Sequence, residues 1–320
     1  MQYDIRFPRS VRYLNPRIAR WGIQLIAVSL ALVADPTAGR AQDSAAEWSA
    51  VDRALGRPGK PQPGEVQRYS FPRSDLKVRV GDVAVRPALA LGSWVAFKRI
   101  GSGNKAMAMG DLVLTEAEVP AVVAKLQAGG VQQTALHNHL QRESPAVMYL
   151  HIEGRGNAVM IAETIRAALA MTKTPTAAPA DQPAPPFSLD TAAIAQALRY
   201  RGSVNGRVYQ VNVPRAHPVR MDGMEIPPAM GLATVINFQP TGNGKAAITG
   251  DFVLTAGEVN PVIRTLEQQG IAITALHSHM LTEEPRLFFM HFWANDDAIR
   301  LARGLRLALE KIKVKAASPH

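Results

Sequence analysis

The chain has 320 residues and a formal net charge of +10, a length that corresponds to about two domains of ordinary size. It contains no cysteine, which excludes disulfide bonds, thiolate metal sites, iron–sulfur clusters and cysteine nucleophiles. The basic residues are scattered and are not interleaved with aromatic residues, so nucleic acid is not an expected partner.

Residues 1–41 have the pattern of a secretory signal peptide. Five arginines within the first 20 residues precede an apolar run of 14 residues (21–34, WGIQLIAVSLALVA), and Gly39 and Ala41 fit the small positions of a cleavage site. Because about 20 residues are needed to span a bilayer, we expect cleavage and a periplasmic or secreted protein without a stable membrane anchor. A buried N-terminal helix or an uncleaved anchor is the alternative. Cleavage removes six arginines and two aspartates, which leaves 30 basic and 24 acidic residues and a net charge of +6.

The rest of the chain consists of one unit that occurs twice, at an offset of 140 residues. Without gaps, residues 110–169 and 250–309 are identical at 23 of 60 positions. Upstream, the similarity continues with small gaps in two pairs of segments: GEVQRYSFPR (64–73) with GRVYQVNVPR (206–215), and VRVGDVAVRPA (78–88) with VRMDGMEIPPA (219–229). Such self-similarity indicates an internal duplication.

A segment rich in proline and alanine separates the two copies. It is poor in bulky apolar side chains and is typical of an extended, semi-rigid linker. We therefore predict a first repeat domain at 42–172, a linker at 173–186 and a second repeat domain at 187–320.

Each copy begins with a predicted β-hairpin. In the first copy WVAFKRI and KAMAMGDLVL flank the turn GSGN, and in the second ATVINFQ and KAAITGDFVL flank TGNG. A helix follows, and Thr115 with Glu118, like Thr255 with Glu258, fits a capping box at its start. A second hairpin, with strands at 131–141 and 146–153 in the first copy, precedes a last helix. The pattern predicts an α+β fold: a tandem duplication of a ββαββα-type unit with leading strands, in which helices pack on one face of an antiparallel sheet.

Six of the eight histidines lie at repeated positions in the second hairpin. TALHNHL (134–140) and TALHSHM (274–280) each contain two, and each copy adds one more further along: His137, His139 and His151, then His277, His279 and His291. Since side chains alternate along a strand, the first two share a face, and a turn centred on 144–146 places His139 across from His151. Three imidazoles then converge in each half, and one metal ion can accept their nitrogens at about 2.0–2.1 Å. We therefore expect a transition-metal site in each half, or one site at the interface of the two halves.

Histidine ligands without cysteine indicate Zn²⁺, Cu²⁺, Ni²⁺ or Fe²⁺, because calcium and magnesium prefer more oxygen ligands. Glu143 and Glu283 follow the histidine pairs and are candidates for a fourth ligand, a hydrogen-bond partner of a ligand, or the catalytic base of a metal-dependent hydrolase. Two interpretations without metal remain. One is a buried histidine–glutamate hydrogen-bond network that holds the turn, and the other is a pocket for a small anionic ligand between the two halves.

The motifs also resemble known families. The spacing H-x-H-x3-E of His137, His139 and Glu143 resembles the first metal-binding motif of cupins, but the preceding helix and the early third histidine depart from a cupin barrel. GDLVLTEAEV and TALHNHL…ESP…LHIEG, with their second copies, resemble the LppY/LpqO family of exported bacterial proteins, whose domain has no established function. This resemblance covers essentially the whole chain after residue 41 and implies an exported protein. The mycobacterial members are lipoproteins that need a cysteine after the signal, and its absence here favours a soluble exported form.

Overall fold

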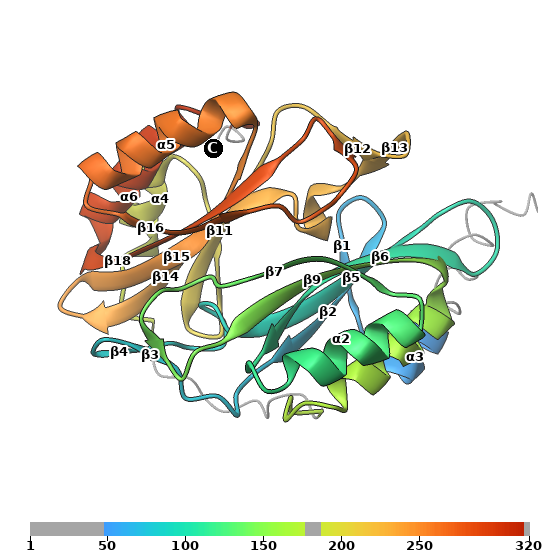
Figure 1. Cartoon of the computed structure of the whole chain (residues 1–320). Helices are drawn as coiled ribbons and strands as arrows, with labels where there is room; N and C mark the ends of the chain where they lie inside the picture. Colours follow the sequence, from blue (N-terminus) through green and yellow to red (C-terminus); the bar gives the residue numbers. More distant parts are fainter. Residues whose placement is uncertain (1–47, 177–186, 317–320) are drawn as a thin grey trace, which may run out of the picture. The chain divides into compact units, whose positions relative to one another are not determined.

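The computed structural model describes residues 48–176 and 187–316 (Figure 1). The predicted signal peptide and most of the predicted linker, residues 177–186, lie outside the described residues. Both repeats belong to one compact unit of the chain. None of the helices described is long and apolar enough to cross a membrane.

Each repeat contains a six-stranded sheet in which all neighbouring strands are antiparallel. The first sheet has the order β1 (Lys60–Gln62), β2 (Val66–Pro72), β5 (Gly92–Arg99), β6 (Lys105–Leu114), β9 (Met148–Asn157) and β7 (Gln132–His137). The second has the order β10 (Ser203–Asn205), β11 (Val208–Pro214), β14 (Ala233–Gly242), β15 (Lys245–Leu254), β18 (Phe288–Asp297) and β16 (Ala272–His277). The same strand order in both halves agrees with the duplication.

Each repeat also has a small three-stranded sheet, which the sequence did not predict. In the first repeat it consists of β4 (Val83–Ala84), β3 (Arg79–Val80) and β8 (Glu143–Ser144). In the second it consists of β13 (Met224–Ile226), β12 (Val219–Met221) and β17 (Glu283–Glu284). The loop after each histidine pair is therefore not a simple hairpin turn, because its β8 or β17 segment pairs with a distant strand.

The helices cover one face of each large sheet. In the first repeat, α2 (Val119–Ala128), α3 (Ala158–Leu169) and a helix over the described residues 48–55 share a core with side chains from the sheet. In the second, α4 (Thr191–Leu198), α5 (Ala256–Gln268) and α6 (Ala298–Leu309) do the same. Figure 1 shows α2 beside α3 and α5 beside α6. The mixed architecture with antiparallel sheets and two similar halves agrees with the prediction at this coarse level.

The opposite faces of the two sheets meet each other. Alternate residues of β6 point to different cores: Ala108 and Leu112 to the helices, Met107 and Met109 to a cluster that includes Val253 from the second repeat. A second shared cluster joins Tyr149 to Val208 and Ala247. Because β6 is buried on both faces, its sequence is a nearly continuous apolar run, and a polar side chain on its inner face is enclosed between the two sheets.

Two local expectations were wrong. The unit does not start with strands, because a short helix leads each repeat, the second capped by Asp190, whose carboxylate accepts from the amide of Ala193 at 2.9 Å. The capping box is present at Thr255 and Glu258, but in the first repeat α2 starts only at Val119. There Glu118 still accepts from the amide of Thr115 at 2.8 Å, within a turn that precedes the helix.

A buried ion pair recurs in the two repeats beside these helix starts. Arg215 donates to Glu258 at 2.8 Å and to the carbonyl of Val253 at 2.7 Å, and Arg73 contacts Glu118 and the carbonyl of Val113 at the same two distances. Each glutamate also accepts from a backbone amide after the last helix of its repeat. The pair therefore ties a strand, a helix start and the end of the repeat together.

The Glu258 pair gives the protein an acid-dependent stability. Burial would raise the pKa of Glu258, but hydrogen bonds from Arg215 and two backbone amides lower it to about 2 from 4.5. The contribution of this ionised carboxylate to the free energy of unfolding is thus fully present above pH 4.5. It is lost as the pH falls towards 2, because Glu258 is protonated in the unfolded chain before it is protonated in the folded protein. We expect denaturant unfolding to show this loss in the wild type and a flatter profile over the same range in Glu258→Gln. Equal slopes for both proteins would contradict the assignment.

Candidate metal centre

The two histidine segments are held by each other's repeat. β7 ends at His137 and β16 at His277, so His139 and His279 lie in the loops that follow. The hydroxyl of Thr134 donates to the carbonyl of His279, and that of Thr274 donates to the carbonyl of His139, both at 2.6 Å. The threonine of each TALH segment therefore fixes the histidine loop of the other half.

His151 and His291 lie on the inner faces of the sheets beside a carboxylate. On β9, His151 is paired with Asp111 of β6, and on β18, His291 is paired with Asp251 of β15. Exposed fractions are 4% for Asp111 and 3% for each of the two histidines. Neighbouring antiparallel strands thus bring an acid and an imidazole together between the sheets in both repeats.

The expected register of the histidine hairpin was wrong. His151 lies opposite Ala135, and His137 lies opposite Tyr149, so His139 has no strand partner there. A bulge at Thr134 shifts the register, and the strand ends before His139. His139 still reaches the site, but from a loop.

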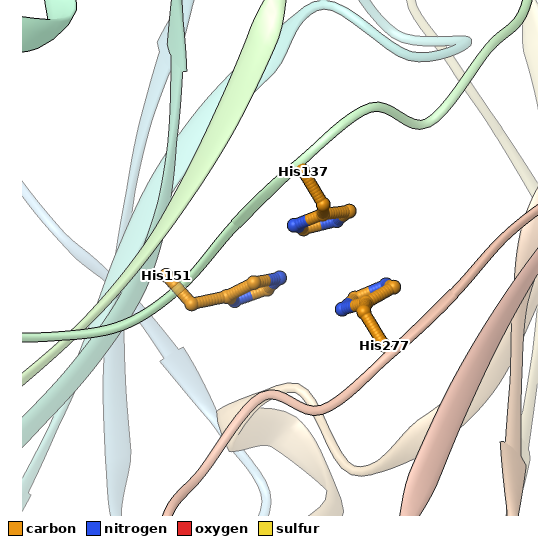
Figure 2. A group of neighbouring side chains, drawn as sticks. All are labelled: His137, His151 and His277. Carbon is orange, nitrogen blue, oxygen red and sulfur yellow. The ribbon is translucent and has the colours of Figure 1, made fainter.

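The six histidines form one cluster that both repeats share. Ring centroids are 3.5 Å apart for His137 and His277, and 3.8 Å apart for two further cross-repeat pairs, His139 with His291 and His151 with His279. The second and third pairs correspond to each other when the repeats are exchanged, as a pseudo-twofold arrangement requires. Figure 2 shows His137, His151 and His277 with their rings directed towards a common space.

The potential ligand atoms fall into four groups of three, each with its atoms within 4.8 Å of one another. Two groups are internal to a repeat and contain one carboxylate each, and two combine histidines from both repeats: Asp111, His139 and His151; Asp251, His277 and His279; His137, His151 and His277; His137, His139 and His291. Distances of this size are compatible with atoms that surround one ion. The His/Asp groups can therefore hold a metal ion.

Backbone carbonyls orient the lone pairs of the rings in the second repeat. Nδ1 of His291 lies 2.7 Å from the carbonyl oxygen of Gly250 and Nδ1 of His277 lies 3.3 Å from that of Ser278. A carbonyl only accepts, so these contacts assign the proton to Nδ1 and leave a lone pair on Nε2 of each ring. The two Nε2 atoms are 2.9 Å apart, so their lone pairs repel each other. A cation that both nitrogens coordinate would remove this repulsion.

Several buried polar atoms of the cluster have no hydrogen-bond partner among the residues that the structure describes. They are both ring nitrogens of His137, Nε2 of His139, His151 and His279, and Oδ1 of Asp111 and Asp251. Nε2 of His279 lies 3.1 Å from Asp251 and that of His139 lies 3.4 Å from Asp111. Buried polar atoms are rarely left unsatisfied in folded proteins, so this concentration of them points to a bound species.

Burial also sets the charge of the cluster. It lowers the pKa of all six histidines, to about 4 for His277 and His291 and to about 3 for His279, so the imidazoles are neutral. Burial and then the carboxylate of Asp251 raise the pKa of Asp111 to about 8. Neutral imidazoles are the form that binds metals, and a nearby dication favours ionised carboxylates.

Comparison with known proteins assigns a family. A family model described as a domain of unknown function (DUF1259) matches residues 49–171 and again residues 192–311, so it covers most of the chain, once per repeat. The chain belongs to this family. No curated protein matches the chain. Among solved structures, a trimeric bacterial microcompartment shell protein, PduB, is similar over 81% of this chain and 96% of that chain, with 13% sequence identity and a TM-score of 0.21, too low to support a structural conclusion.

The two glutamates expected near the metal lie outside the ligand groups of this DUF1259 protein. Glu283 holds its own loop, where it accepts from the amide of Leu287 at 2.9 Å and from Arg286 at 3.3 Å. Glu143 lies on β8, and its Oε1 is buried without a partner. Alanine stands at residue 146 where the second repeat has Arg286, so Glu143 lacks the equivalent ion pair.

Sequence reasoning missed the two aspartates of the DUF1259 repeats. Both stand in the repeated motifs GDLVL and GDFVL, where each is the only charged residue after the first lysine of a ten-residue strand. A repeated acid within a buried strand was the available signal, because a buried carboxylate requires a partner. The motif was assigned to the second strand of the first hairpin, without a role for its aspartate.

Proposed function

We propose that this protein binds transition-metal ions between its two repeats, with six histidines and two aspartates as ligands. The observation that supports this most strongly is a set of seven buried nitrogen and oxygen atoms without a hydrogen-bond partner among the described residues. They lie on four histidines and two aspartates of one cluster. A metal-free hydrogen-bond network would have satisfied these atoms with one another or with the backbone.

The ligand chemistry restricts the ion. Imidazole and carboxylate without thiolate suit Zn²⁺, Cu²⁺, Ni²⁺ or Fe²⁺, in that these ions accept nitrogen ligands, whereas calcium and magnesium prefer oxygen. The two groups that contain an aspartate each consist of two histidines and one carboxylate. This set is used by several catalytic and structural sites, so it does not by itself select one metal.

The number of ligands favours two ions. The groups Asp111–His139–His151 and Asp251–His277–His279 have no residue in common, so both can be filled at once. Eight side chains match two four-coordinate ions, whereas a single ion would leave at least two of them buried and unpaired. His137 and His291 supply the remaining ligands between the two groups.

The burial of the cluster favours binding over hydrolysis. A hydrolytic metal needs an open coordination position that the substrate reaches, whereas structural sites are closed by protein ligands. Asp111, His151 and His291 are nearly inaccessible, and neither glutamate belongs to a ligand group. We infer that the ions join the two repeats and that metal binding, rather than hydrolysis with a glutamate base, is the activity of this centre.

The proposal also concerns the location of the protein and its relationship to known families. We infer that the chain is a periplasmic or secreted relative of the LppY/LpqO proteins, on the basis of its N-terminal pattern and of the motifs around TALHNHL. The periplasm or the extracellular space would then be the source of the metal.

Metal analysis of untagged protein tests the proposed function. Elemental analysis of protein purified without a chelator should find two equivalents per chain of one or more of Zn, Cu, Ni and Fe. A content of one metal equivalent per chain would support metal binding by the cluster but would refute the arrangement with two ions. Protein that stays metal-free, and whose thermal stability ignores all four metals, would refute it.

Substitution of the aspartates is expected to separate the two ions. Asp111→Ala should lose the ion of the first group and keep one equivalent, and Asp251→Ala should give the same result for the second. Loss of a direct ligand should weaken binding by more than the 10- to 100-fold typical of outer hydrogen-bond partners. Asp296→Ala, which removes a partly exposed carboxylate paired with Arg300, is the matched control and should keep both ions. Full metal content in both cluster variants would contradict the prediction.

A further inference from the structure

A cavity of about 330 Å³ lies where the first repeat meets the hairpin β14–β15 of the second. From the first repeat it is lined by Asp82, Val83, Ala84 and Arg86, and from the second by Gln239, Pro240, Thr241, Lys245 and Asn295. Gln239 fixes this junction, because its amide donates to the carbonyl of Ala84 at 2.8 Å and its oxygen accepts from the amide of Arg86 at 2.9 Å. The cavity is therefore bounded by backbone that both repeats hold in place.

Two cations line this cavity, and the charge of a third acts on one of them. Arg86 and Lys245 line it, and the side chain of Arg86 has no ion pair or hydrogen bond to any other described residue. Arg207 is not among the lining residues, but Gly206 before it packs on Ala88, where an added Cβ would lie 2.8 Å from the methyl group, and the charge of Arg207 acts on Arg86. Nε of Arg207 is buried and has no hydrogen-bond partner within the described residues 48–176 and 187–316.

The charges around these cations do not neutralise them. Burial, and then repulsion by Arg207, lowers the pKa of Arg86. Asp82 is the one acidic residue in the lining, and Asp296, which lies near Lys245, is paired with Arg300. Arg86 is exposed, so water screens part of the repulsion between the two guanidinium groups. An anion that both of them bind would replace the rest of this repulsion with attraction.

The corresponding junction, at which the second repeat meets the hairpin β5–β6 of the first, is built differently. There Gly64 packs on Pro227, as Gly206 packs on Ala88, but the repeats place Glu65 where Arg207 stands and Pro227 where Arg86 stands. Its charges are paired: Arg155 with Asp222 at 2.7 Å and Lys98 with Glu65 at 3.6 Å. Asn295 replaces Arg155 at the cavity, so one junction is closed by ion pairs and the other keeps an open space with unpaired cations.

We propose that this cavity binds a small anion that carries a carboxylate or phosphate group, held by Arg86, Arg207 and Lys245. Guanidinium groups bind both kinds of group in a bidentate manner, and this favours arginine at such sites. The volume is at the lower end of that of ligand pockets, which restricts the ligand to a small metabolite-sized molecule. The site is separate from the histidine cluster and does not depend on metal binding.

Isothermal titration calorimetry of the full chain at low ionic strength tests the proposal, with inorganic phosphate and succinate as probes in separate titrations. Saturable binding of at least one probe at one site per chain is expected. Arg86→Gln and Arg207→Gln should each weaken it by at least 10-fold, at unchanged metal content. Binding of phosphate alone, or of succinate alone, would assign the chemical group.

The matched control is Arg155→Gln, which removes the cation of the closed junction and should leave the affinity within twofold of the wild type. Asp82→Asn should strengthen binding, because it removes the acidic group of the lining. The absence of saturable binding for both probes would overturn the proposal. So would equal weakening in Arg155→Gln and Arg86→Gln, because that would reflect the overall charge of the protein rather than this cavity.

Discussion

The double variant His139→Ala/His277→Ala is expected to lose both metal ions and all metal-dependent stabilisation. These two histidines were chosen because each of the four ligand groups contains one of them. No group of three ligands therefore remains intact. A single substitution at His137 would leave the two aspartate groups unchanged and would be a weaker test.

The expected size of this effect follows from mass action. A metal that binds only the folded state stabilises it by about 4 kcal/mol when its concentration is 1,000 times the dissociation constant. For a protein of this size, this corresponds to a rise in Tm of roughly 10 °C. Thermal unfolding with and without added Zn²⁺, after treatment with a chelator, measures the difference directly. It should be large in the wild type and close to zero in the variant.

His217→Ala is the matched control for this experiment. His217 is exposed and belongs to none of the ligand groups, so its removal should leave the metal-dependent rise in Tm unchanged. Alanine substitutions also lower Tm by creating cavities. Because this loss is the same with and without metal, the metal-dependent difference in Tm of each protein does not contain it. A wild-type rise in Tm that persists in the double variant would show that the metal binds elsewhere.

Arg215→Met is expected to lower the free energy of unfolding by about 3–5 kcal/mol, because it leaves the carboxylate of Glu258 buried without its cation. Arg215 and Glu258 are 6% and 9% exposed, so water cannot replace the lost ion pair. Urea denaturation of metal-free protein measures the change without interference from the histidine cluster. A change below about 1 kcal/mol would contradict the proposed role of the pair.

Two controls separate the ion pair from general effects of substitution. The double variant Arg215→Met/Glu258→Met should be less destabilised than Arg215→Met alone, because no unpaired charge remains. Arg300→Met, which breaks an exposed pair with Asp296, should change the free energy of unfolding far less than Arg215→Met does.

The fold was predictable to the extent that the sequence repeats itself. The offset of 140 residues, the turn sequences and the apolar alternation gave the duplication and the antiparallel hairpin β5–β6. The leading helix at 48–55 was missed because it is short and its apolar face is only a few residues wide. The pairing of β8 with β3 was not predictable, because a two-residue strand leaves no periodic pattern and its partner lies about 60 residues away.

The candidate site was predictable in its histidines but not in its arrangement. Repetition alone identified all six side chains, but the local alternation of a strand could not decide between one site per half and one site at the interface of the halves. The cluster exists because the inner faces of the two sheets meet, a long-range contact that no local pattern contains. The register was wrong because the connection between β7 and β9 spans residues 138–147 and pairs through β8 with β3, instead of forming a tight turn centred on 144–146.

The most direct test of the central claim is anomalous diffraction from crystals of the untagged protein, recorded at the absorption edge of the metal found by elemental analysis. We predict two anomalous peaks between the repeats, one beside Asp111, His139 and His151 and the other beside Asp251, His277 and His279, with nitrogen and oxygen ligands at about 2.0–2.2 Å. A map without any peak in this cluster, in which water or direct hydrogen bonds satisfy Nε2 of His139, His151 and His279, would contradict the account.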